Sequence, residues 1–162
     1  MSAAEVQSFI AEYYLKAGND AAAQTAYENS IRQSILFYYG VRAISNDNVA
    51  GSLAPTSTSE IDGYIAGNGV NWTKATSAAS KLQLIATQKW LHLNVVEPYE
   101  NWAEYRRLKL PALGFQADTS NPLSQPPSRW VYPSEESTYN TANYAAVSAN
   151  DVSTKKIFWD VK

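Results

Sequence analysis

The chain has 162 residues, a net charge of −2, no cysteine and one histidine, so its composition excludes several kinds of site. Without cysteine there is no disulfide, thiolate nucleophile or thiolate-bound metal. The lysines and arginines are scattered and give no electrostatic footprint for nucleic acid, and no apolar run approaches the roughly 18 residues of a membrane span. The hydrophobic share of 45% is that of a globular chain, and the length predicts one domain over residues 1–162.

Capping signals and hydrophobic periodicity predict an all-α fold. Ser2 and Glu5 form a capping-box pair, and Ser57 and Glu60 repeat it. Pro98 suits the first turn of a helix, where a missing N–H costs nothing. The expected helices cover residues 3–17, 20–39, 58–66, 77–94, 98–108 and 135–148.

The first two expected helices resemble a tetratricopeptide-like pair, a repeat of about 34 residues with small and large residues at fixed places. Small residues let two helices cross closely, and aromatic residues fill the adjacent holes. The small places hold Ala11, Ala23 and Ser30, and the aromatic places hold Tyr14 and Tyr27. Ile35 stands where the repeat has a proline, so the second helix is expected to continue and to stop near Gly40.

The stretch 81–107 is expected to form the centre of the fold. Apolar residues lie on two sides of its first helix, which indicates packing from both sides. Trp90 and Trp102 are therefore expected to be largely buried. Residues 111–133 hold five of the seven prolines and are expected to be an irregular wrap over the helices. We expect Arg106 or Arg107 to bind this wrap through the planar donor fork of the guanidinium.

The candidates for catalysis and metal binding are acidic residues and the single histidine. Glu97, Glu100 and Glu104 lie at helical spacing, either as catalytic carboxylates or as a solvated face that pairs with nearby basic residues. No second carboxylate stretch completes a glycosidase pair, so we expect the solvated face and no catalytic residue. His92 has no second histidine or cysteine to share a metal, so neither a metal site nor a cofactor is expected.

Trp72 is the one ligand-binding candidate. Its neighbours Asn71, Thr73 and Lys74 are polar, and it lies in an expected loop. A loop tryptophan can stack on a sugar ring, or it can plug a gap between helices, since large aromatic residues are usually buried. The remaining tryptophans are expected to anchor the core or the wrap, and they are Trp90, Trp102, Trp130 and Trp159. Asn140 and Asn143 could bind sugar hydroxyls, but such side chains more often cap loop backbone.

Several motifs in the second half occur in an order and spacing that characterise one protein family. They are TQKW at 87–90, NWAEYRR at 101–107 followed by Pro111, PPSRWVYPSEE at 126–136, Asn140 and Asn143, and KIFWD at 156–160. With these motifs the chain resembles the C-terminal part of the SusD/RagB-like outer-membrane lipoproteins. Tetratricopeptide-like pairs precede this region in the family, as the first two helices would here.

The resemblance implies a SusD-like, mostly helical fold and a glycan-binding component of an outer-membrane nutrient uptake system. Members lie on the surface of Gram-negative cells and pass oligosaccharides, or sometimes peptides, to a SusC-type TonB-dependent transporter. They are not enzymes. Full members are much longer and begin with a lipoprotein signal and an acylated cysteine, so this chain is expected to be a C-terminal segment, joined to the membrane only through a lipid anchor that it lacks. The alternative is a tetratricopeptide-like protein-interaction scaffold without a small ligand.

Overall fold

The computed structural model describes residues 1–46, 56–115, 120 and 126–160. Contacts within the chain separate two compact units, Met1–Pro111 and Ala112–Lys162. The expectation that residues 1–162 form one domain stays a prediction. Residues 47–55, between the second and third expected helices, and residues 116–119 and 121–125 of the expected wrap lie outside the described residues.

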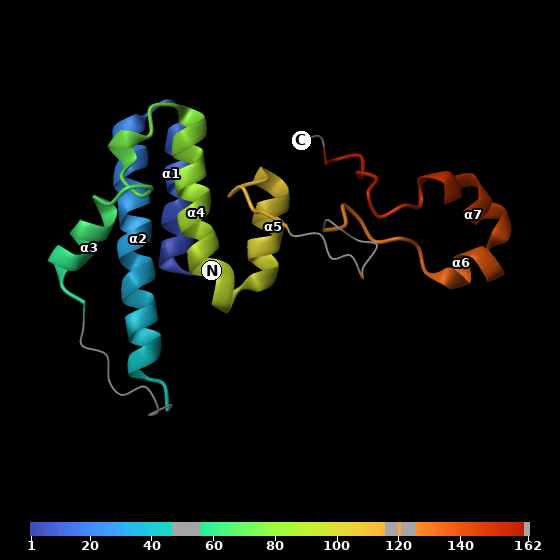
Figure 1. Ribbon diagram of the computed structural model, residues 1–162, viewed down its shortest axis with the longest axis horizontal. Coiled ribbons are helices and arrows are strands. Elements are labelled where there is room, and N and C mark those ends of the chain that lie inside the picture. Colours follow the sequence, from blue (N-terminus) through green and yellow to red (C-terminus); the bar gives the residue numbers. More distant parts are fainter. Residues whose placement is uncertain (47–55, 116–119, 121–125, 161–162) are drawn as a thin grey trace. The chain divides into compact units, whose positions relative to one another are not determined.

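The first unit is a group of packed helices. In chain order it holds α1 (Ala3–Lys16), α2 (Asp20–Ala43), α3 (Thr58–Ile65), the 3₁₀ helix η1 (Trp72–Lys74), α4 (Ala78–Val96) and α5 (Pro98–Leu108). Helix α1 packs against both α2 and α4, while α3 contacts α2 and α5 contacts α4 (Figure 1). The second unit holds α6 (Ser134–Tyr139), α7 (Thr141–Val147) and the 3₁₀ helix η2 (Ser148–Asn150). Every regular element in the described ranges is a helix, which confirms the all-α prediction.

The helices begin where the capping signals predict. At α1 the Ser2 Oγ accepts a hydrogen bond from the Glu5 main-chain N–H at 3.1 Å, and the Glu5 carboxylate accepts one from the Ser2 N–H at 3.2 Å. Ser57 and Glu60 form the same reciprocal pair at α3. Pro98 occupies the first position of α5, where its ring costs no hydrogen bond. These local contacts set the helix boundaries in the first unit.

The tetratricopeptide-like packing of α1 on α2 is confirmed. Ala11 and Ala23 are fully buried and Ser30 nearly so, so small side chains lie where the two helices meet. Tyr27 is also fully buried, with its ring against Trp72 and its hydroxyl donating to the Val70 main-chain oxygen. The core then extends through α3, η1 and α4, with Ile31, Ile61, Ile65, Val70, Trp72 and Ile85. Helix α2 continues past Ile35 as expected, but it ends at Ala43 rather than near Gly40.

The expected single helix 135–148 is instead two helices with a break at Asn140. This residue has φ −128° and ψ 37°, outside the helical region. Its amide donates to the Glu136 carboxylate at 2.8 Å and accepts from the Asn143 side chain at 2.6 Å. An asparagine side chain competes with the helical backbone for hydrogen bonds, which accounts for a break at this position.

Candidate functional site

Trp72 lies in the core of the first unit and is only 2% exposed. Its ring packs on Tyr27 with centroids 5.2 Å apart, and the Lys81 ammonium lies 5.3 Å from its centroid. Its Nε1–H donates to Asp20 at 3.3 Å. The polar neighbours in sequence instead form η1, in which Asn71 caps the N–H of Thr73. The ring has no open face for a sugar, so the ligand-binding expectation is corrected: Trp72 plugs the gap between helices.

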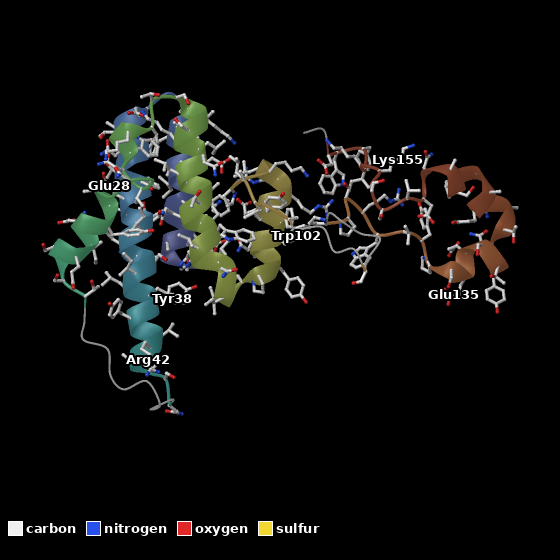
Figure 2. The ribbon with its side chains drawn as sticks, viewed as in Figure 1. Glu28, Tyr38, Arg42, Trp102, Glu135 and Lys155 are labelled. Carbon is white, nitrogen blue, oxygen red and sulfur yellow. The ribbon has the colours of Figure 1, made fainter. Side chains whose placement is uncertain are left out.

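His92, on α4, links this helix to α1 and α2. Its ring is 3% exposed, with Nε2 2.7 Å from Ser2 Oγ and Nδ1 2.9 Å from Ser34 Oγ. The hydroxyl of Tyr38, which projects from α2 in Figure 2, donates to the His92 main-chain oxygen. Burial lowers the pKa of His92, and the carboxylates of Glu5 and Glu97 offset part of that effect. The ring is thus neutral and holds the helices together. In the described part of the chain, no three side chains that could hold a metal ion lie together.

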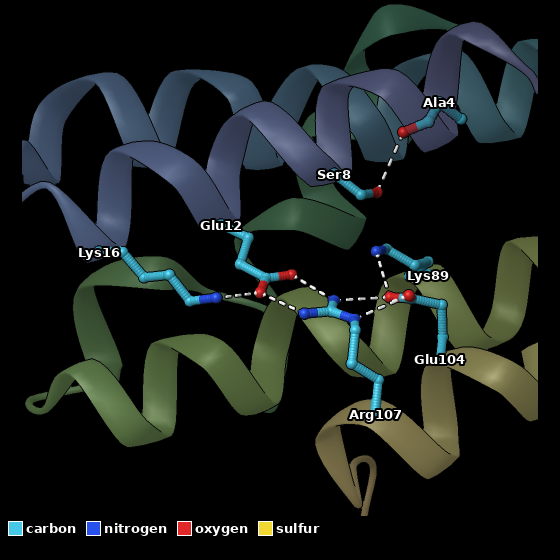
Figure 3. A network of polar contacts seen from close by, with 7 residues as sticks. All are labelled: Ala4, Ser8, Glu12, Lys16, Lys89, Glu104 and Arg107. Carbon is cyan, nitrogen blue, oxygen red and sulfur yellow. Dashed lines mark hydrogen bonds and ion pairs between the residues drawn. The ribbon is translucent and has the colours of Figure 1, made fainter. Parts of the chain in front are cut away.

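A chain of charged side chains joins α5 to α1 and α4 (Figure 3). Arg107 binds Glu12 through two hydrogen bonds and Glu104 through two more. Glu104 also accepts from the ammonium of Lys89 at 2.7 Å, and Lys16 binds Glu12 at 2.6 Å. This network is structural, because each carboxylate is already held by two cations.

The pKa values in this network follow from its pairing. Hydrogen bonds from Arg107 lower the pKa of Glu12 to about 2, against the opposing effect of burial. Burial raises the pKa of Glu104, but its bonds from Arg107 and Lys89 outweigh this and the net shift is downward. Burial lowers the pKa of Lys89, which also lies 3.6 Å from the centroid of Phe9. Two carboxylates held ionised in this way serve neither as general acid nor as general base near neutral pH.

Several predicted site residues therefore have other roles or positions. Glu104 is half-buried rather than solvated, and Glu97 pairs with the N-terminal ammonium at 3.6 Å. The guanidinium nitrogens of Arg107 bind Glu12 and Glu104. The expectation that Arg106 or Arg107 also binds the wrap stays a prediction.

The tryptophans outside η1 are less buried than expected. Trp90 and Trp102 are half-buried, and each packs against Tyr105. In the second unit Trp130 is 86% exposed and Trp159 is 53% exposed, so neither is a core residue of that unit. The segment that carries Trp130 is nonetheless held in place, since the Tyr132 N–H donates to Asp151 at 2.9 Å.

One cavity in the first unit lies between α2, α3 and α4. Its volume is about 420 Å³, and its apolar wall comes from Ile31 and Ile35 on α2, Ile61 on α3 and Leu91 on α4. His92 and Tyr38 also line it, as do Ala4 and Ser8 of α1. Nothing in the sequence signals this cavity, because the four apolar residues belong to three helices and each also fits an ordinary helical stripe.

The family of the chain follows from comparison with known proteins. The model of one family, described as starch-binding and associating with the outer membrane, matches residues 1–133. The chain belongs to this SusD-like family. No curated protein sequence matches it. Among the described residues, none of the helices combines the length and apolar character that crossing a bilayer requires.

A solved structure supports the same SusD-like fold. The crystal structure of a SusD homolog from Bacteroides fragilis matches 100% of the chain, with a TM-score of 0.70 and 25% sequence identity. The chain covers 35% of that homolog, so it spans about a third of the length of this relative. The all-α SusD-like fold implied by the sequence motifs is confirmed.

Proposed function

We propose that the chain is the C-terminal, helical segment of a longer protein that binds glycans for uptake across the outer membrane. The observation that carries this proposal is the match of a starch-binding, outer-membrane-associated family model to residues 1–133. The length of the B. fragilis homolog supports it, because a protein of that size has room for a ligand site beyond these helices.

The longer protein would lie on the cell surface, attached by a lipid anchor outside this chain, and would deliver oligosaccharides or peptides to a SusC-type TonB-dependent transporter. It would bind its ligand without hydrolysing it. The charged side chains of the first unit support this, since Glu12 and Glu104 are engaged in ion pairs rather than placed as a free carboxylate pair.

The test uses the longer protein that contains this segment, beside the 162-residue chain. Calorimetric titration with a panel of oligosaccharides should show binding to the longer protein and weak or no binding to the segment. Co-purification should recover a TonB-dependent transporter with the longer protein. Release of reducing sugar would contradict the non-enzymatic function, and micromolar glycan binding by the segment alone would contradict placing the ligand site elsewhere.

A protein-interaction scaffold is the alternative, and the tetratricopeptide-like packing of α1 on α2 favours it. Under that function the longer protein would bind no glycan from the panel but would retain a protein partner. The two functions are therefore separated by the titration, whatever partner is recovered.

A further inference from the structure

We propose that the cavity between α2, α3 and α4 is a binding site for a neutral, predominantly apolar molecule of one or two rings. This site is separate from the glycan binding proposed above and does not depend on it.

The volume suits a small organic ligand. Protein sites for such ligands are clefts of about 300–1,000 Å³ with mainly hydrophobic and aromatic walls and few polar groups. The cavity of about 420 Å³ lies within that range. An apolar cavity of about 150 Å³ can hold one benzene molecule, so the present one has room for two fused or linked rings.

The polar side chains around the cavity are mostly committed to the protein. Ser30 Oγ donates to the Tyr27 oxygen at 2.7 Å. Ser34 Oγ pairs with the ring of His92, whose main-chain oxygen takes the hydroxyl of Tyr38. A sugar placed here would lose water from many hydroxyl groups and regain few hydrogen bonds, which is costly. A flat apolar molecule has no such cost.

Two polar groups can still orient a ligand. Gln88 and Tyr39 are among the lining residues, and neither the amide nitrogen of Gln88 nor the hydroxyl of Tyr39 has a hydrogen-bond partner in the described part of the chain. Among the described residues that line the cavity, the exposed Glu60 is the one with a carboxylate, and hydrogen bonds from Ser57 lower its pKa, so it stays ionised. Its negative charge disfavours an anionic ligand. The apolar wall favours a neutral ligand over an ion of either sign, because an ion would lose water there, and the two polar residues allow the ligand one hydrogen-bonding substituent.

A second apolar groove, of about 440 Å³, provides an internal comparison. All six residues that line it, from Met1 to Tyr14, belong to α1 or to the two residues before it. It is therefore one face of a single helix, whereas the cavity is walled by several helices. The larger enclosure of the cavity favours it as the ligand site, because more of a ligand surface is removed from water.

The test is a titration of the 162-residue chain with the neutral fluorophore N-phenyl-naphthylamine. Its emission should rise and saturate. Leu91 lines the cavity and is 53% exposed, so Leu91→Glu removes an apolar contact to the ligand and should weaken the binding by about threefold or more. Val95→Glu, one helical turn further along α4 and 75% exposed, is the matched control and should bind as the wild type. Tyr13→Glu, in the groove on α1, should also leave binding unchanged.

The opposite results would overturn the proposal. One such result is that the wild-type chain shows no saturable binding of the fluorophore. Another is that Leu91→Glu and Val95→Glu weaken the binding equally, and a third is that Tyr13→Glu alone abolishes it. Displacement of the fluorophore by a maltooligosaccharide would overturn the apolar ligand class. Far-ultraviolet circular dichroism checks that each variant is folded. Independently of any variant, addition of the fluorophore should shift the methyl resonances of Ile31, Ile35 and Ile61 in the wild-type chain, and unshifted resonances would contradict the proposal.

Discussion

The guanidinium of Arg107 holds the carboxylate of Glu12 in a two-pronged contact, with Nη1 to Oε1 at 2.7 Å and Nη2 to Oε2 at 2.6 Å. The two residues are 95 positions apart, and the contact fixes α5 on α1. The Glu12 side chain is only 6% exposed, so it depends on this partner for compensation of its charge.

Arg107→Ala should therefore destabilise the first unit. Loss of one partner of a fully buried ion pair costs about 3–5 kcal/mol. Because the Arg107 side chain is 39% exposed, we expect about 2 kcal/mol of unfolding free energy in urea. Lys16→Ala is the control, since it removes the other cation on Glu12 but is 63% exposed, and it should cost less than about 1 kcal/mol. Equal losses in the two variants would contradict the special role of Arg107.

The same contact predicts a dependence of stability on pH. The pKa of Glu12 is about 2 in the folded chain, below its ordinary value of 4.5. The unfolded chain therefore binds more protons between these values, so this stability is complete above pH 4.5 and is lost as the pH falls toward 2. With allowance for screening by solvent, the loss is about 2 kcal/mol. Urea unfolding of the wild type and of Glu12→Gln across this range should give curves that converge at low pH, and parallel curves would refute the assignment.

Trp72→Ala should be among the most damaging substitutions in the chain. The side chain is 2% exposed, and removing a buried tryptophan costs about 3–5 kcal/mol. Trp72→Phe should cost less, because it keeps most of the contact with Tyr27 and loses the hydrogen bond to Asp20. Trp102→Ala removes a half-buried ring and serves as the comparison. If Trp102→Ala were the more damaging of the two alanine variants, η1 would not be part of the core.

His92 should add a second pH-dependent term at milder acidity. Burial lowers its pKa below 6.5, so the unfolded chain takes up its proton first as the pH falls. Stability from the neutral ring is thus complete above pH 6.5 and declines as the pH falls through the lowered pKa. Urea unfolding at neutral and mildly acidic pH should show this decline in the wild type and not in His92→Gln. A decline of the same size in His92→Gln would assign it to other groups.

Local signals in the sequence predicted the helices well. A capping box such as Ser2 with Glu5 involves residues three positions apart, so the sequence holds the whole interaction. The small residues at Ala11 and Ala23 likewise indicated a close helix crossing, which the structure confirms. The break at Asn140 was missed, because the helical pattern continues on both sides of it.

The contacts that define the interior were harder to predict, because they join distant residues. Trp72 has polar neighbours in sequence, yet its partners Asp20 and Tyr27 lie on α2. Glu12 and Lys16 have the sequence spacing of an ordinary surface ion pair. Only the structure shows that the Glu12 side chain is buried and bound to Arg107. Neither relationship leaves a periodic pattern, so the sequence does not indicate either of them.

Ser2 takes part in two contacts of very different range. Its hydroxyl oxygen caps α1 through the N–H of Glu5, and the same oxygen lies against the ring of His92 on α4. The first turn of α1 is therefore completed by a helix whose residues are added about 90 positions later in synthesis. Until α4 is in place, this turn has only its local cap and frays more readily. Formation of α1 and arrival of α4 thus become one cooperative event, and the exchange rate of the Glu5 amide hydrogen with solvent measures how far that event has gone.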